Sequence, residues 1–115
     1  MAVIYTANED YQLGSGFLKL SVTVGNGQYA NTLVKLDTQV KAWGIFPEII
    51  LDTVQNCKDK KLFLEINATD SKPNTQTIPI TVIVKDDINA KTYSYTEEAD
   101  VEGGTVLFNV YINLV

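Results

Sequence analysis

The chain has 115 residues, which is the size of one ordinary domain. Its 45% hydrophobic and 20% charged residues exclude a disordered or low-complexity chain. The net charge of −5 at pH 7 argues against a nucleic acid or an anionic membrane as partner, because both need clustered basic residues.

Several residue types that carry chemistry are absent. The chain has no histidine and no arginine, and Cys57 is its one cysteine. A disulfide framework, a Cys/His zinc site and a Cys/His nucleophile pair are therefore excluded. We expect Cys57 to be a small apolar filler, and we expect neither cofactor nor metal nor enzymatic activity.

The first residues, 1–15, are weakly patterned. We expect a flexible arm or an arm that docks on a neighbour, with a short strand at Val3–Tyr5. The N-terminal residues lack the basic region and the apolar stretch of a secretory signal. No apolar run reaches the ~18 residues of a membrane span. The expected location is the cytoplasm if Met1 is the native start, but a chain trimmed of its signal would look the same.

Period-two alternation, which is typical of β-strands, then begins at Phe17–Val24. Gly25-Asn26-Gly27 predicts a hairpin turn, because it supplies residues that adopt positive φ. A returning strand is expected from Tyr29 to Trp43. Its predicted inward residues are Val34, Leu36, Val40 and Ala42.

The segment from Pro47 to Cys57 breaks the alternation. Ile50, Val54 and Cys57 recur at helical spacing, and proline and glutamate stand in the first turn, where both are favoured. We predict a short amphipathic helix here; an irregular strand with a bend is the alternative.

Three further strands alternate cleanly, and a shorter one lies among them. The predicted inward residues are Leu62, Leu64, Ile66 and Ala68 in one, Ile78, Ile80, Val82 and Val84 in the next, and Val106, Phe108, Val110, Ile112 and Leu114 in the last. Tyr93 and Tyr95 mark the short strand and are expected to pack into the core. Residues 86–90 are its predicted hairpin loop.

These patterns predict one mainly β domain over 1–115. We expect an antiparallel β-sandwich, immunoglobulin-like or jelly-roll-like, with about seven strands and one short helix near 47–57. The Cys…Trp…Cys spacing of immunoglobulin domains is absent, so the resemblance would be one of architecture only.

The faces opposite to the predicted core are mostly polar, but nearly every strand places a large apolar residue there. The candidate interface residues are Phe17, Leu33, Trp43, Phe63, Leu107 and Tyr111, with Lys35 and Lys41 on the rim. If contiguous, they would form a patch that marks an interface. Alternatively, the helix covers some of them, or a bulge near Trp43 reverses the register.

The final strand, Thr105–Val115, has no proline and no charge. At an exposed sheet edge it would be an aggregation hazard. We therefore expect it to be central in its sheet; pairing with another chain is the alternative.

Carboxylates cluster at Asp86-Asp87 and between Glu97 and Glu102. The two clusters should lie at opposite ends of the short strand, which argues against a shared calcium site and favours solvated turns. Asn67-Ala68-Thr69 is a formal glycosylation sequon.

The sequence thus predicts a non-enzymatic protein-interaction or structural module, and self-association into a homo-oligomer is one form of it. The alternative is a carbohydrate-binding module that stacks a sugar on Trp43, Tyr29, Tyr93, Tyr95 or Tyr111.

Overall fold

The computed structural model describes residues 3–25, 28–70, 77–101 and 103–115. These residues form nine strands and one short helix. In chain order they are β1 (Val3–Tyr11), β2 (Phe17–Val24), β3 (Tyr29–Leu36), β4 (Gln39–Gly44), β5 (Ile49–Thr53), α1 (Val54–Cys57), β6 (Lys61–Thr69), β7 (Thr77–Lys85), β8 (Ala90–Glu98) and β9 (Thr105–Leu114).

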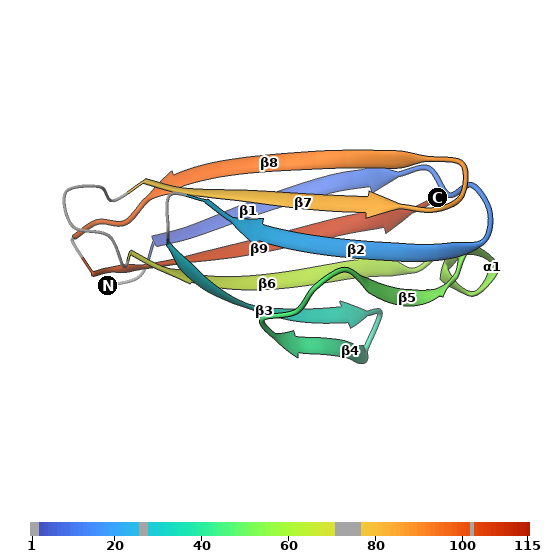
Figure 1. The fold of residues 1–115 in the computed structure, drawn as a ribbon, viewed down its shortest axis with the longest axis horizontal. Helices are drawn as coiled ribbons and strands as arrows, with labels where there is room; N and C mark the ends of the chain where they lie inside the picture. Colours follow the sequence, from blue (N-terminus) through green and yellow to red (C-terminus); the bar gives the residue numbers. More distant parts are fainter. Residues whose placement is uncertain (1–2, 26–27, 71–76, 102) are drawn as a thin grey trace.

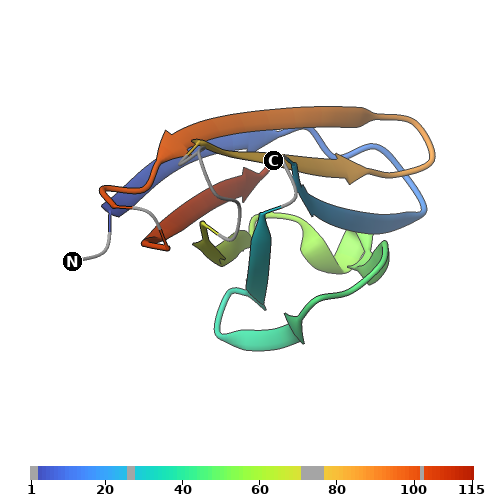
Figure 2. The ribbon, with the colours of Figure 1, turned by 60° about the vertical axis from the view of Figure 1, so that its left-hand side comes forward.

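The strands form two sheets that face each other (Figure 1). One has the order β1-β9-β6-β3-β4 and the other β5-β2-β7-β8. In Figure 2, β8 (orange) and β7 (gold) lie above β9 (red) and β6 (yellow-green). The predicted mainly β sandwich with antiparallel pairing is confirmed, although β1 runs parallel to β9. Its immunoglobulin-like or jelly-roll-like type stays a prediction.

The core lies between the sheets, where alternation places every second side chain. In β9 the five predicted inward residues, from Val106 to Leu114, are at most 1% exposed, and the predicted inward residues of β6 and β7 are buried as well. Each buried aliphatic or aromatic side chain contributes ~1.5–3 kcal/mol relative to an exposed one. The predicted inner faces of these three strands are therefore confirmed.

Residues 3–11, expected to belong to an arm, form the strand β1. Val3 pairs with Val106, and the ladder continues to Tyr11 opposite Leu114. β9 also pairs with β6 along its whole length, from Thr69 opposite Thr105 to Lys61 opposite Asn113. The predicted central position of β9 is thus confirmed.

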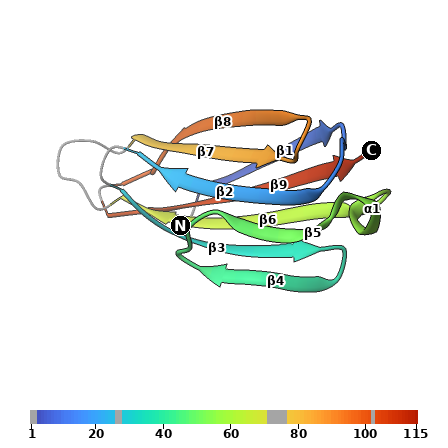
Figure 3. The same cartoon turned by 45° about the vertical axis from the view of Figure 1, so that its right-hand side comes forward.

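The single strand expected between Tyr29 and Trp43 is wrong, because Asp37 and Thr38 turn the chain between β3 and β4. Asp37 adopts a φ of 51°, which aspartate tolerates better than most residues. Its carboxylate accepts a hydrogen bond from the Lys61 amide (2.9 Å), and its own amide donates to the Lys61 carbonyl (2.8 Å). Figure 3 shows β4 at the edge of the five-stranded sheet, beside β3.

A register shift between Val34 and Lys35 changes which side chains of β4 face outward. Val40 lies opposite Lys35, whereas Ala42 lies opposite Val34 and Trp43 opposite Leu33. Val40, predicted to face inward, is 54% exposed. The bulge therefore reverses the end of β4 near Val40, while Trp43 keeps its predicted outward direction.

The segment from Pro47 to Cys57 contains a short helix, as predicted, but α1 covers only Val54–Cys57. The residues before it form β5, which pairs with β2. Thr53 caps the helix, because its side chain accepts a hydrogen bond from the Asn56 amide (3.2 Å). The helical spacing of Ile50 and Val54 was misleading, because pairing with β2 outweighs local preference.

The hairpin predicted at Gly25-Asn26-Gly27 is not formed, since β2 and β3 lie in different sheets; Asn26 and Gly27 are outside the described residues. The Gly25 amide donates to the Pro79 carbonyl (3.0 Å), but proline has no amide to return the bond. The Gly25 carbonyl instead accepts from the Gln28 amide (3.1 Å). The β2–β7 ladder ends here, and the chain crosses to the other sheet.

Tyrosine hydroxyls tie β8 of one sheet to β1 of the other. Tyr93 and Tyr95 are buried, as predicted. Tyr93 donates to the Asp10 carbonyl (2.7 Å) and Tyr95 to the Glu9 carboxylate (2.6 Å). Burial, followed by the negative charges of Glu9 and Asp10, raises the pKa of Tyr93 to about 12.

Asp86, in the predicted loop between β7 and β8, connects three parts of the chain. Its carboxylate accepts hydrogen bonds from the Tyr11 hydroxyl (3.0 Å) and from the amides of Gly14, Ile88 and Asn89 (2.8 Å each). A Cβ at Gly14 would lie 2.5 Å from an Asp86 oxygen, so only glycine allows this approach. Burial alone would raise the pKa of Asp86, but these hydrogen bonds outweigh it and the pKa is lowered.

Replacing Asp86 by alanine is expected to lower the free energy of unfolding by about 2 kcal/mol, because several charge-assisted hydrogen bonds, most of them half-buried, are lost together. Chemical denaturation at pH 7 measures the change. Asp87→Ala is the control, since Asp87 is the exposed carboxylate next along the loop. Equal losses in the two variants would contradict the role of Asp86.

The Asp86 contribution should also depend on pH. Its folded-state pKa lies below the unfolded value of about 4, so the stabilisation is complete above that value and is lost as the pH falls through the folded-state pKa. The difference in unfolding free energy between the natural protein and Asp86→Asn should therefore shrink on acidification. A constant difference down to strongly acidic pH would contradict this assignment.

Candidate functional site

The outer face of the five-stranded sheet carries most of the candidate interface residues. Residues directly opposite each other in a ladder point to the same side, so the register places them in rows. Trp43, Leu33 and Glu65 lie in one row across β4, β3 and β6. Lys35, Phe63 and Tyr111 lie in the next row across β3, β6 and β9.

Trp43, Leu33, Phe63 and Tyr111 form a diagonal strip across four strands, which we call the apolar band. The rings of Phe63 and Tyr111 are 4.9 Å apart between centroids and inclined by 31°. Leu33 lies diagonally beside Phe63, a spacing that large side chains bridge. Trp43 ends the band and is 73% exposed, the largest exposed fraction among the exposed large hydrophobic residues described.

The other two candidate residues do not join the band. Leu107 is on the same face, but it lies opposite Asn67 and Ile4, and Asn109 separates it from Tyr111 along β9. Phe17 lies in the four-stranded sheet, opposite Thr53. The structure therefore brings together four of the six predicted interface residues and places Phe17 on a different sheet.

The two predicted rim lysines have different positions. Lys35 lies between the band and Val40, as expected for a rim residue. Lys41 is drawn by the bulge toward the other sheet, where its amine is 3.8 Å from the carboxylate of Asp52. Its side chain is only 17% exposed, so the expectation that Lys41 borders the band is wrong.

The outer face of this sheet is electrically balanced. Its charged strand residues outside the bulge, identified from the register, are Lys35, Lys61, Glu65 and Asp10. Two lysines against two carboxylates give a formal charge of zero, in a chain whose net charge is −5. The excess negative charge thus lies elsewhere on the molecule.

Three further apolar side chains near this face are exposed, of which the sequence pointed only to Tyr29, as a candidate for sugar stacking. Ile4 is 64% exposed opposite Leu107, Val40 is 54% exposed, and Tyr29 is 53% exposed at the start of β3. Ile4 lay within the expected short strand Val3–Tyr5 but was not assigned to the interface. Asp37-Thr38 was the available signal for the turn that places Val40.

Cys57 and the two acidic segments are the remaining chemical candidates. Cys57 is fully buried, as expected of an apolar filler. Burial, assisted by the charge of Asp52, raises the pKa of its thiol to about 11. The two acidic segments lie at opposite ends of β8, and the residues described contain no group of three or more candidate metal ligands.

Comparisons with protein family models, with curated proteins and with solved structures find no match. Among the residues that the structure describes, no helix has the length and apolar character needed to cross a membrane.

The burial of Cys57 predicts that its thiol does not react in the folded protein. A colorimetric disulfide reagent at pH 8 should label it only at the rate of unfolding, because the thiolate is scarce and shielded. Denatured protein supplies the control, in which labelling should be rapid. Rapid labelling under native conditions would contradict the structural role.

Proposed function

We propose that the chain is a non-enzymatic protein-interaction or structural module that binds through the apolar band, and that the partner is a second copy of the chain. The observation that carries this proposal is the contiguity of Trp43, Leu33, Phe63 and Tyr111 across four strands. Tryptophan and tyrosine are the usual energetic anchors of protein interfaces.

The charge distribution favours a second copy over a foreign partner. Two molecules that each carry −5 repel one another overall, but the face around the band is neutral. Lys35 and Glu65 lie on adjacent rows of this face, so a two-fold arrangement can place the lysine of one copy near the glutamate of the other. Sheets that pack face to face in this way exclude water from large side chains.

Replacing Trp43 by aspartate is expected to weaken self-association by about 30-fold or more, which corresponds to the loss of an anchor worth about 2 kcal/mol. Light scattering across a concentration series measures the assembly, and a thermal melt measures the fold. Because Trp43 is 73% exposed, the melting temperature should change little.

Ile88→Asp is the matched control, because Ile88 is 70% exposed but belongs to the loop between β7 and β8. It should assemble like the natural protein. A monomer at all concentrations would contradict the second copy as partner. An unfolded Trp43→Asp variant would contradict the exposed position of this side chain.

A second candidate function, sugar binding, is supported by the amide groups beside the band. Asn31 lies opposite Asn67, and Asn109 lies opposite Glu65 and next to the band. Exposed aromatic faces with neighbouring amides and carboxylates suit a sugar ring, which offers both a flat apolar side and hydroxyl groups. Of the five aromatic candidates, Tyr93 and Tyr95 are buried and are therefore removed from this role.

Sugar binding predicts a saturable change of Trp43 fluorescence when a glycan is added, because Trp43 is the chain's one tryptophan. A glycan array selects the ligand, and a titration measures its affinity. Asn67→Ala should weaken this binding without weakening self-association. No response from any glycan would exclude this second function.

A further inference from the structure

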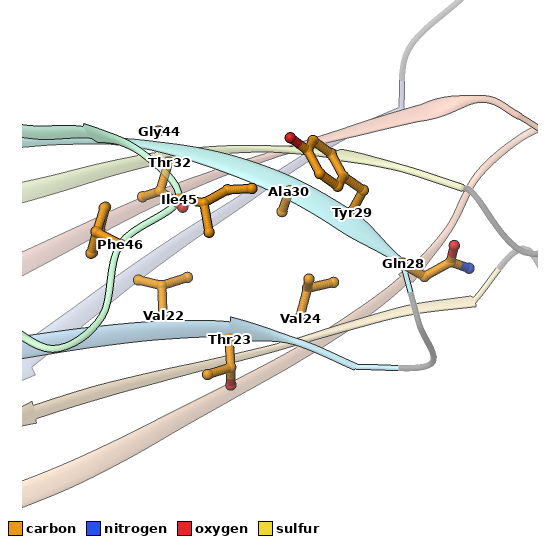
Figure 4. Close-up of a pocket in the computed structure, with 10 residues that line it drawn as sticks. All are labelled: Val22, Thr23, Val24, Gln28, Tyr29, Ala30, Thr32, Gly44, Ile45 and Phe46. Carbon is orange, nitrogen blue, oxygen red and sulfur yellow. The ribbon is translucent and has the colours of Figure 1, made fainter.

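A cleft opens between the two sheets at the end where β2 stops and β3 begins (Figure 4). Its volume is about 390 Å³. Side chains from both sheets and from the β4–β5 connection line it, and none of the ten lining residues is charged. Val22 and Val24 approach it from β2, Ala30 from β3, and Ile45 and Phe46 from the connection.

Two strand edges beside this cleft lack a neighbouring strand among the described residues. β5 pairs with β2 only from Phe17 to Leu20, which leaves the open edge from Ser21 to Val24. β4 pairs with β3 only from Thr32 to Leu36, which leaves the edge from Tyr29 to Asn31. In Figure 1, β5 accordingly runs beside only the first half of β2.

The direction of the backbone groups on β2 follows from its pairing with β7. Consecutive residues of a strand direct their N–H and C=O groups to opposite edges. Because the Gly25 amide donates to Pro79 on β7, Val24 directs its backbone groups to the open edge, and Val22 does the same. The side chains of these two valines point into the cleft.

We propose that an extended peptide segment of a partner protein binds in this cleft by adding a strand to the free edge of β2, in line with β5. Its backbone pairs with Val22 and Val24, and its alternate side chains enter the cleft. These inward side chains are apolar and uncharged, because the lining offers no charged group to pair with. Ile45, 66% exposed, lies against the added strand.

The backbone groups of Val22 and Val24 at the open edge favour a peptide over a small apolar molecule as the occupant. An apolar ligand could fill the volume, but it would leave the donors and acceptors of Val22 and Val24 without a protein partner. The side chains of an extended peptide fill the cleft, and every second residue of the peptide forms hydrogen bonds with the backbone of Val22 or Val24. The site is also separate from the apolar band, which lies on the outer face of the other sheet.

The experiment pans a random peptide library against the natural protein and measures the affinity of the enriched sequences. These sequences are expected to alternate apolar and polar residues. Ala30→Trp should weaken their binding about tenfold or more, because the indole fills the cleft. Ala90→Trp is the matched control, since Ala90 is exposed at the start of β8, and it should bind like the natural protein.

Hydrogen exchange of the natural protein gives a second measurement that needs no variant. Bound peptide should slow exchange at the Val22 and Val24 amides, whereas the Thr23 amide, which faces β7, should change little. The proposal is overturned by a library without enriched peptides, by equal binding to Ala30→Trp, or by binding that leaves the Val22 and Val24 amides unprotected. If the Trp43→Asp variant still binds the peptides, the peptide site is distinct from the apolar band.

Discussion

The requirement that β9 be hydrogen-bonded on both edges organises the five-stranded sheet. An uncharged strand of this length cannot stand at an exposed edge without inviting aggregation. β6 covers one edge and the parallel strand β1 covers the other, so the first strand of the chain closes against the last. With β9 fixed, its inward residues form the centre of the core and its outward Tyr111 meets Phe63. The apolar band is thus a by-product of the same pairing that protects the strand.

The two long sides of the sandwich are closed differently. On the β1–β8 side, the tyrosine hydroxyls and Asp86 connect the two sheets through buried or half-buried hydrogen bonds. On the β4–β5 side, the connection between the sheets includes the half-buried ion pair of Lys41 with Asp52, and the edges beyond it have no neighbouring strand among the described residues. An ion pair 3.8 Å long is a weaker contact than the hydrogen bonds of 2.6–3.0 Å on the β1–β8 side, so the β4–β5 side is the less constrained of the two. Both proposed binding surfaces involve this less constrained half of the molecule.

The sequence predicts which face of a strand is buried better than it predicts how the strands pair, and the reason is physical. Alternation is a local property of each strand, so the inner faces of β6, β7 and β9 and the outward direction of Trp43 follow from it. The bulge that turns Val40 outward and Lys41 toward Asp52 depends on how β3 and β4 meet, which no local pattern records. Likewise, β5 forms because it pairs with the first half of β2, and the cleft lies beside the second half, where the described residues supply no partner strand on that edge.

The parallel pairing of β1 with β9 also determines how the chain would respond to tension. β1 starts at Val3 beside Val106, and β9 ends at Leu114 beside Tyr11, so the start of β1 and the end of β9 lie at opposite ends of the sheet. A force that pulls the ends of the chain apart then slides the two strands along each other. All hydrogen bonds of the ladder carry this load together, instead of opening one after another as in a peeled hairpin. This topology therefore favours resistance to stretching along the β1–β9 ladder.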